Sequence, residues 1–271
     1  MAQIPSPGSI IVADWHLCKD SKEYFTKILH KKRRKQFGLL ESPMMSPIAA
    51  VDTVQYKIFL SGKSGVGKTS VVARLAGVNI PSMHYETIGK ILSISVSLKA
   101  KILYSNLVFC LGIETTIVYW PVKIKDSGRV LFFRLQLWDC GENALRRFDH
   151  MLPSCKEEVD AVLLLFSFTD LTSFEDLPNQ ISKWTGPSLV KVVVGTKFDL
   201  FMHCDVAERE VRAFRATWGL PLLRVGGEVS DGLGDVAPLL NCLCENLWHQ
   251  DCLRARAERD HAQTETTDTY L

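Results

Sequence analysis

The 271-residue sequence has no CxxC pair, and its eight cysteines are scattered along the chain. Zinc modules need closely spaced pairs of cysteine or histidine ligands, so this spacing argues against a zinc site. The N-terminus also lacks the basic segment and apolar core that are typical of a secretory signal peptide. We therefore expect a reducing, cytoplasmic setting with free thiols.

Long apolar runs are missing as well. A transmembrane helix needs about 18 or more consecutive apolar residues. The segment that comes nearest, ILSISVSLKAKILYSNLVFCLG, carries Lys99 and Lys101 near its centre. Position 2 is not glycine and the final DTYL is not a prenylation box, so we expect no lipid anchor. Any membrane role would run through protein partners or a weak peripheral contact.

An excess of charge of one sign is also absent. The 32 Lys and Arg residues nearly balance 30 Asp and Glu residues, which leaves a net charge of +2. No global field therefore favours nucleic acid as a partner. A content of 46% hydrophobic and 23% charged residues is typical of a soluble folded domain. The length suffices for one core with extensions.

Residues 1–53 read as a basic, proline-rich N-terminal extension. Within it, Phe25, Ile28 and Leu29 have helical spacing, and the basic run HKKRRK occupies 30–35. One interpretation is a short helix docked on the main domain. A second is a basic patch for acidic lipid or a partner, and a third is a nuclear import sequence.

Residues 54–253 alternate between strand-like and helix-like segments, which predicts one α/β domain with a six-stranded, mostly parallel sheet. The strand candidates are 54–61, 113–124, 131–138, 161–168, 191–195 and 220–225. Pro121 suits an antiparallel edge strand, where a missing N–H donor costs little. The helix candidates that follow the first α/β unit are 143–152, 173–184, 207–218 and 235–253. The polar residues 254–271 predict a disordered tail.

The stretch GKSGVGKT matches the phosphate-binding pattern GxxxxGK[ST] between a strand and a helix. Glycines let the backbone wrap phosphates, and the helix N-terminus favours negative charge. Lys68 would reach the β- and γ-phosphates, and the Thr69 hydroxyl would hold Mg²⁺. The predicted phosphate-binding residues are Gly62, Ser64, Gly65, Val66, Gly67, Lys68, Thr69 and Ser70.

The stretch TKFD follows the fifth strand candidate and resembles the guanine-recognition element [NT]KxD. The Asp199 carboxylate can accept two parallel hydrogen bonds from the guanine edge, which adenine cannot donate. The Lys197 stem would lie over the base, and Thr196 completes the predicted nucleotide contacts. The ligand expected from these residues is GTP or GDP.

The motifs occur in the order and spacing of the Ras superfamily, and HYETIG, which contains Thr87, is similar to the first switch of Rab proteins. Finer details resemble one divergent Rab-like branch of small GTPases, the ciliogenesis and planar polarity effector family. These details are FGLL, WDCGE followed by FDHML, LFSFTD with SFEDLP, TKFD and LWHQD.

The resemblance implies a Ras-like G domain of the P-loop NTPase class that binds GTP or GDP with Mg²⁺, with Thr69 and Thr87 as metal ligands. It also implies a cytoplasmic, cytoskeleton-associated role at the basal body of the cilium. Cilium assembly, targeted vesicle traffic and exocytosis are the implied processes, and Inturned and Fuzzy are the implied partners.

The stretch LWDCGENA departs from the family because its Asp-x-x-Gly element is one residue short. Asp139 should still serve Mg²⁺ through water, and the Gly141 N–H can still meet the γ-phosphate. Glu142 stands in place of the glutamine that orients the attacking water, although Asn143 is an alternative occupant. A carboxylate cannot donate a hydrogen bond and adds negative charge, so slow hydrolysis is expected.

Two further departures affect the predicted site. The fifth guanine-contact element, usually Ser-Ala-Lys, is not recognisable, and LLRVGGE stands near its place. An apolar insert, Lys90–Gly112, follows the first switch. It is either a functional effector loop or a translated intron, because codons for Gly89-Lys90 and for Phe109–Gly112 can carry splice-donor and splice-acceptor sequences.

Three functions compete. The first is a GTP-driven switch with slow intrinsic hydrolysis, and the second is a non-hydrolysing scaffold that keeps GTP bound. The third is a P-loop kinase or ATPase, which Asp199 contradicts and for which no lid or second substrate site is visible.

Overall fold

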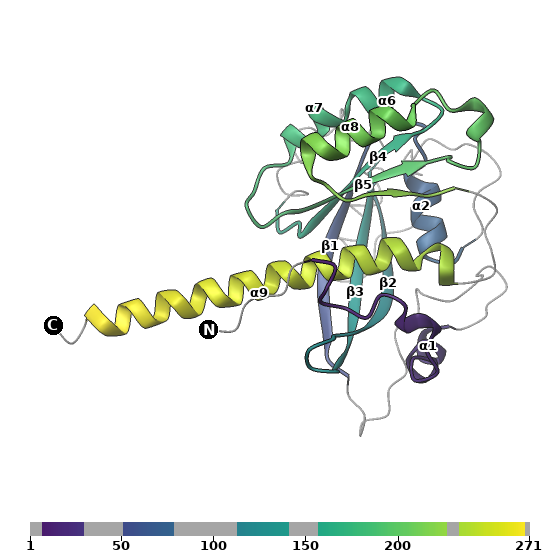
Figure 1. Ribbon diagram of the computed structural model, residues 1–271. Coiled ribbons are helices and arrows are strands. Elements are labelled where there is room, and N and C mark those ends of the chain that lie inside the picture. The colour runs from purple at the N-terminus through teal and green to yellow at the C-terminus, as the bar shows by residue number, and fades with distance from the viewer. Residues whose placement is uncertain (1–6, 30–50, 79–112, 141–156, 227–232, 269–271) are drawn as a thin grey trace, which may run out of the picture.

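The computed structural model describes residues 7–29, 51–78, 113–140, 157–226 and 233–268. Its centre is a six-stranded sheet with the order β2-β3-β1-β4-β5-β6 (Figure 1). The strands are β1 (Thr53–Ser61), β2 (Ile113–Lys123), β3 (Val130–Cys140), β4 (Ala161–Ser167), β5 (Val190–Thr196) and β6 (Leu222–Arg224). Strand β2 is antiparallel to β3, and all other neighbours are parallel. The predicted sheet, including its antiparallel edge, is confirmed.

Two helical layers cover the sheet (Figure 1). Burial at every position of β4 matches its continuous apolar sequence, as parallel strands between two layers require. One core cluster joins the sheet to α1 (Lys22–Ile28), α2 (Lys68–Leu75) and α9 (Ala237–Asp268). The second joins it to α6 (Leu171–Glu175), α7 (Leu177–Lys183) and α8 (Glu208–Trp218). Short 3-10 turns lie at Trp15–Leu17, Phe201–His203 and Leu233–Asp235.

The single helix predicted over 173–184 is wrong, because the structure divides this segment into α6 and α7. Helix α6 begins earlier than predicted, where the Asp170 side chain accepts hydrogen bonds from the N–H groups of Thr172 and Ser173. Pro178 lies in the first turn of α7, where its missing N–H is harmless. In a continuous helix its ring would clash with the carbonyl of Phe174, so the helix restarts instead. The prediction of helix α8 over 207–218 is confirmed, and that over 143–152 lies outside the described residues.

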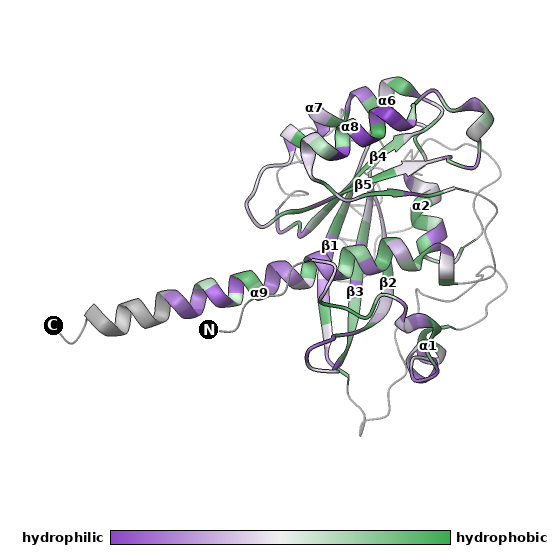
Figure 2. Cartoon of the chain, viewed as in Figure 1, coloured by the Kyte–Doolittle hydropathy of each residue, from purple (hydrophilic) through white to green (hydrophobic). Residues whose placement is uncertain are grey.

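The tail predicted to be disordered from residue 254 is helical instead, since α9 continues to Asp268. Glycine and proline are absent from this stretch, and alanine and arginine, both good helix formers, recur in its first half. Arg256 pairs with Asp260 at 3.9 Å, a spacing that supports a solvated helix. Figure 2 shows the contrast along α9, whose domain-facing part is largely apolar and whose projecting part alternates between hydrophilic and apolar bands.

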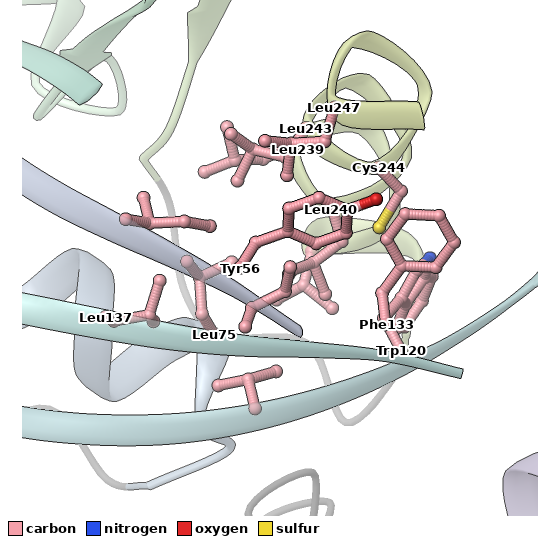
Figure 3. Packing of buried hydrophobic residues seen from close by; sticks show 14 of the residues in the cluster. Tyr56, Leu75, Trp120, Phe133, Leu137, Leu239, Leu240, Leu243, Cys244 and Leu247 are labelled. Atoms are coloured by element: carbon pink, nitrogen blue, oxygen red, sulfur yellow. The ribbon is translucent and has the colours of Figure 1, made fainter. Parts of the chain in front are cut away.

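The domain-facing part of α9 supplies much of the core. Figure 3 shows Leu240, Leu243 and Cys244 directed toward Tyr56 and Phe133 of the sheet. The Tyr56 hydroxyl donates to the Asp251 carboxylate at 2.6 Å and so fixes the register of α9 on β1. Burial raises the pKa of Tyr56, and the Asp251 carboxylate raises it further.

The described part of the N-terminal extension, residues 7–29, packs against the core of the main domain. Ile11 forms an antiparallel bridge with Ile124, directly beyond β2. Phe25 and Ile28 are buried in the same cluster as the sheet, and the Phe25 ring meets Trp120 edge-on at 5.1 Å. This packing confirms the interpretation of α1 as a docked helix. The basic run at 30–35 and the insert at 90–112 lie outside the described residues.

Candidate functional site

The phosphate-binding pattern lies where the predicted strand–loop–helix places it, between β1 and α2. Gly65 and Gly67 have φ angles of +78° and +95°, which side-chain-bearing residues rarely adopt. A Cβ atom at Gly62 would lie 2.7 Å from the carbonyl oxygen of Leu165 in β4. The loop therefore needs glycine at these positions for its own shape. Val66 is buried, so only its backbone is available to a ligand.

Lys68 is folded across this loop. Its side chain is only 7% exposed, and its ammonium group donates to the carbonyl oxygens of Gly62 at 2.8 Å and Lys63 at 2.9 Å. These contacts hold a positive charge over the loop at the N-terminus of α2. A buried cation beside helical N–H groups is suited to phosphate oxygens.

Asp139 comes from the end of β3 and meets the start of α2. The Thr69 hydroxyl donates to Asp139 Oδ2 at 2.5 Å. Asp139 is 1% exposed, and its other oxygen, Oδ1, has no hydrogen-bond partner among the described residues. Burial raises the pKa of Asp139, while the Thr69 hydroxyl and the Lys68 charge oppose that rise.

This buried carboxylate tests whether Mg²⁺ fits the site. A buried carboxylate with an unpaired oxygen is costly unless a cation or donor meets it. A threonine hydroxyl and a carboxylate are oxygen donors of the kind that Mg²⁺ takes, often with water between. Thr69 and Asp139 therefore fit the group that the sequence predicted for them. Within the described ranges no cluster of three or more His, Cys, Asp or Glu side chains suggests another metal site.

The guanine-recognition candidates follow β5. Lys197 has a φ angle of +56°, an uncommon value for a residue other than glycine. Such backbone conformations occur often where a loop is shaped for binding. Asp199 is exposed two residues later, on the same edge of the sheet as the phosphate-binding loop.

Thr196 has a role that the sequence did not reveal. Its side chain is buried, and its hydroxyl bonds to the carbonyl oxygens of Val66 and Phe166. These bonds tie the TKFD loop to the phosphate-binding loop. Thr196 thus aligns the two predicted binding elements, and its hydroxyl does not point outward toward a base.

Of the remaining predicted residues, Thr87, Gly141 and Glu142 lie outside the described residues. Ser64 is exposed and Ser70 is half-buried beside Thr69. The sequence did not single out Arg224 and Gly226, which the structure brings to the TKFD loop. The hint in the sequence was that LLRVGGE, which contains both residues, stands near the place of the fifth guanine-contact element.

None of the helices in the described ranges is long and apolar enough to cross a membrane.

Comparison with known proteins agrees with this architecture. Residues 104–233 match the Ras family. The chain is 64% identical to ciliogenesis and planar polarity effector 2 of Danio rerio over 92% of this chain and 90% of that protein. It is 49% identical to the Homo sapiens protein of the same name, over 94% of this chain and 95% of that protein. More distant similarity extends to the Ras-related protein RabF1 of Dictyostelium discoideum, 25% identical over 73% of this chain and 89% of that protein. The chain therefore belongs to the ciliogenesis and planar polarity effector 2 family, a Rab-like branch of the Ras superfamily.

Proposed function

We propose that this protein is a guanine-nucleotide-binding switch with slow intrinsic GTP hydrolysis. The observation that carries the proposal is the pair formed by Thr69 and Asp139 beside the Lys68 loop, in which one buried Asp139 oxygen has no partner among the described residues. This arrangement supports binding of a phosphate chain together with a cation. Asp199, aligned with the same loop through Thr196, supports guanine as the base.

Each group has a distinct task in this proposal. Lys68 exchanges its two carbonyl partners for phosphate oxygens, which are stronger acceptors because they are charged. Bound Mg²⁺ neutralises phosphate charge and supplies Lewis acidity. Thr69 and Asp139 would hold it, Asp139 through water. Asp199 accepts the N1–H and the exocyclic amine of guanine, and Thr87 closes on the site in the GTP-bound state.

Base specificity provides the sharpest test. We expect GDP or GTP, and not ADP or ATP, to be released when the purified chain is denatured and its nucleotide is identified by chromatography. Asp199→Asn should move the preference from guanine to xanthine nucleotides, because an amide can donate to the xanthine carbonyl. Asp205→Asn, an exposed residue of the following loop, serves as the matched control. Retained guanine preference in the Asp199 variant would contradict the assignment.

Slow turnover is the second part of the proposal. With Glu142 in the place of a glutamine, the attacking water lacks a side chain that can both accept and donate. We expect hydrolysis by the isolated protein to be no faster than about 10⁻⁴ per second, the order of unassisted Ras. Glu142→Gln should be at least as fast as the parent in a single-turnover assay. No measurable turnover in either protein would favour the alternative, a GTP-bound scaffold that only assembles partners.

The shared name of the most similar relatives supports a role in cilium assembly and planar polarity. We extend the proposal to action in the cytoplasm at the basal body, in targeted vesicle traffic, with Inturned and Fuzzy as protein partners. Affinity capture of those two proteins by the GTP-loaded chain, but not by Lys68→Ala, is the expected result. Equal capture by both forms would show that partner binding does not depend on the bound nucleotide.

A further inference from the structure

The end of β6 runs beside the TKFD loop. Arg224 is paired with Gly195 in the parallel ladder of β5 and β6, and the next N–H, that of Val225, donates to the Gly195 carbonyl at 2.8 Å. The chain that leaves β6 is therefore held against Gly195, the residue directly before the TKFD loop. This places Gly226 and Arg224 against the residues that are proposed to read the base.

Gly226 makes the closest approach. A Cβ atom at this position would lie 2.5 Å from Asp199 Oδ1 and 2.7 Å from the backbone nitrogens of Phe198 and Asp199. These separations are shorter than any normal van der Waals contact, and two of the three atoms belong to the backbone. A side chain at residue 226 would therefore have to displace the Asp199 loop. Only glycine leaves the loop in its present position.

The side chain of Arg224 contacts the same loop. The guanidinium carbon lies 4.6 Å from the centre of the Phe198 ring, and the group also pairs with Glu208 of α8. The Phe198 ring meets Phe168 edge-on at 5.0 Å. Phe198 remains 37% exposed although it lies between Lys197 and Asp199, so this stack is its main anchor.

The loop needs such anchors. Lys197 holds a left-handed backbone conformation, and within the described part of the chain the Asp199 carboxylate accepts no hydrogen bond and joins no ion pair. An exposed carboxylate without partners samples several rotamers, and movement of its backbone would spread its position further. Discrimination by paired hydrogen bonds needs the carboxylate in one position.

We propose that Gly226 and Arg224 form a brace that positions Asp199 and thereby sets the selectivity of the protein for guanine. The brace stands where the sequence lacks a recognisable Ser-Ala-Lys element. The inference rests on the proposed guanine-nucleotide binding. It assigns to these two residues a positioning role, through Asp199, in place of direct contact with the base.

Selectivity between GDP and IDP isolates this role. IDP lacks the exocyclic amine and loses one of the two hydrogen bonds to Asp199, while its phosphates are identical. Because hydrogen bonds to charged groups are strong, the parent should prefer GDP by about tenfold or more. Competition against a fluorescent GDP analogue gives both affinities, and the ratio cancels changes in phosphate binding.

Gly226→Ala should lower the GDP-to-IDP ratio by about threefold or more, because the methyl group displaces Asp199. Gly234→Ala is the matched control, since a Cβ there meets nothing within 4 Å and the backbone has no positive φ. The control should keep the parent ratio and melting temperature. An unchanged ratio in Gly226→Ala would overturn the inference.

A second test uses Arg224→Met and Arg224→Lys, which change an exposed side chain. These variants test the brace even if Gly226→Ala does not fold. Methionine keeps an unbranched apolar stem but loses the charge over Phe198, so the ratio should fall by about twofold to threefold. Lysine should restore part of it. A parent-like ratio in Arg224→Met would contradict the brace. A parent that binds GDP and IDP equally would overturn the role of Asp199, and one that binds no guanine nucleotide would overturn the proposed function itself.

Discussion

The two ends of the β2–β3 hairpin are built in contrasting ways. At one end, where β3 finishes, Asp139 has a buried oxygen without a partner in the described part of the chain, and Lys68 donates to two backbone carbonyls. At the other end, where β2 meets the N-terminal segment, most polar groups are hydrogen-bonded, although His16 Nδ1 has no partner among the described residues. The Glu245 carboxylate accepts from the N–H groups of Ile10 and Ile11 at 2.9 and 3.3 Å.

At this second end the hydrogen-bonded side chains come from three different elements. The Asn241 side chain of α9 accepts from the Trp120 indole at 2.8 Å and donates to the Ala13 carbonyl at 2.6 Å. Asp20 accepts from the Trp15 indole at 3.0 Å and pairs with Lys123 at 2.8 Å. These contacts join the N-terminal segment, β2 and α9.

The difference separates the candidate binding site from a region whose polar groups are mostly paired within the chain. Unpaired buried polar atoms are tolerated where a ligand or ion supplies the missing partner. Satisfied polar groups around an aromatic core lock the chain in one arrangement. Substitutions at the two ends should therefore affect binding and stability separately.

Trp15→Ala should give the largest effect, a loss of about 3–5 kcal/mol in unfolding free energy. The Trp15 side chain is buried against Tyr24 and Phe25, and its removal leaves a large cavity. Denaturant unfolding measures this, and GDP affinity should remain within about twofold. Leu17→Ala is the control because Leu17 is 73% exposed. A large loss of affinity in folded Trp15→Ala protein would show that the two ends are not independent.

Lys68→Ala should lower GDP affinity by about a hundredfold while leaving the unfolding free energy of the nucleotide-free protein nearly unchanged. The reason is that the ammonium group bonds to half-buried backbone carbonyls of its own loop, which water can reach in the variant. Lys63→Ala is the matched control in the same loop, since the Lys63 ammonium donates outward to the Thr172 carbonyl. Isothermal titration measures the GDP affinity of both variants, and an equal loss of affinity in the two would contradict the assignment of Lys68.

Asp139→Asn should remove most of the Mg²⁺ dependence of GDP binding. Chelation should weaken binding to the parent by about tenfold and to the variant by much less, because the amide holds a cation poorly. The nucleotide-free variant should be as stable as the parent within about 1 kcal/mol, since a neutral side chain avoids the burial cost of the carboxylate. Undiminished Mg²⁺ dependence would show that Asp139 does not serve the ion.

Glu245→Gln should give the smallest effect, a loss of about 1 kcal/mol in unfolding free energy. The amide oxygen can still accept from Ile10 and Ile11, but without the charge. Glu258→Gln, on an exposed stretch of the same helix, should change nothing measurable. If the two variants are equally stable, the N-terminal segment is held mainly by its apolar side chains.

The sequence by itself determined the elements whose causes are local. Continuous apolar runs predicted β4 and β5, Pro121 marked β2 as the edge strand, and the spacing of Gly62, Gly67 and Lys68 predicted the glycine-rich loop between β1 and α2. Each of these depends on the preferences of neighbouring residues for backbone conformation and burial. Asp199 was identifiable for the same reason, because its motif directly follows a strand.

Only the tertiary structure decided the contacts between distant segments. The partnership of Ile10 with Glu245 spans 235 positions, and the approach of Gly226 to Asp199 depends on how β6 pairs with β5. The buried hydroxyl of Thr196 likewise acquires its role only when the phosphate-binding loop lies beside it. Local sequence patterns specify which surfaces are apolar or polar. Which of those surfaces meet is set by the packing of the whole chain, in which each contact is stabilised only together with the others.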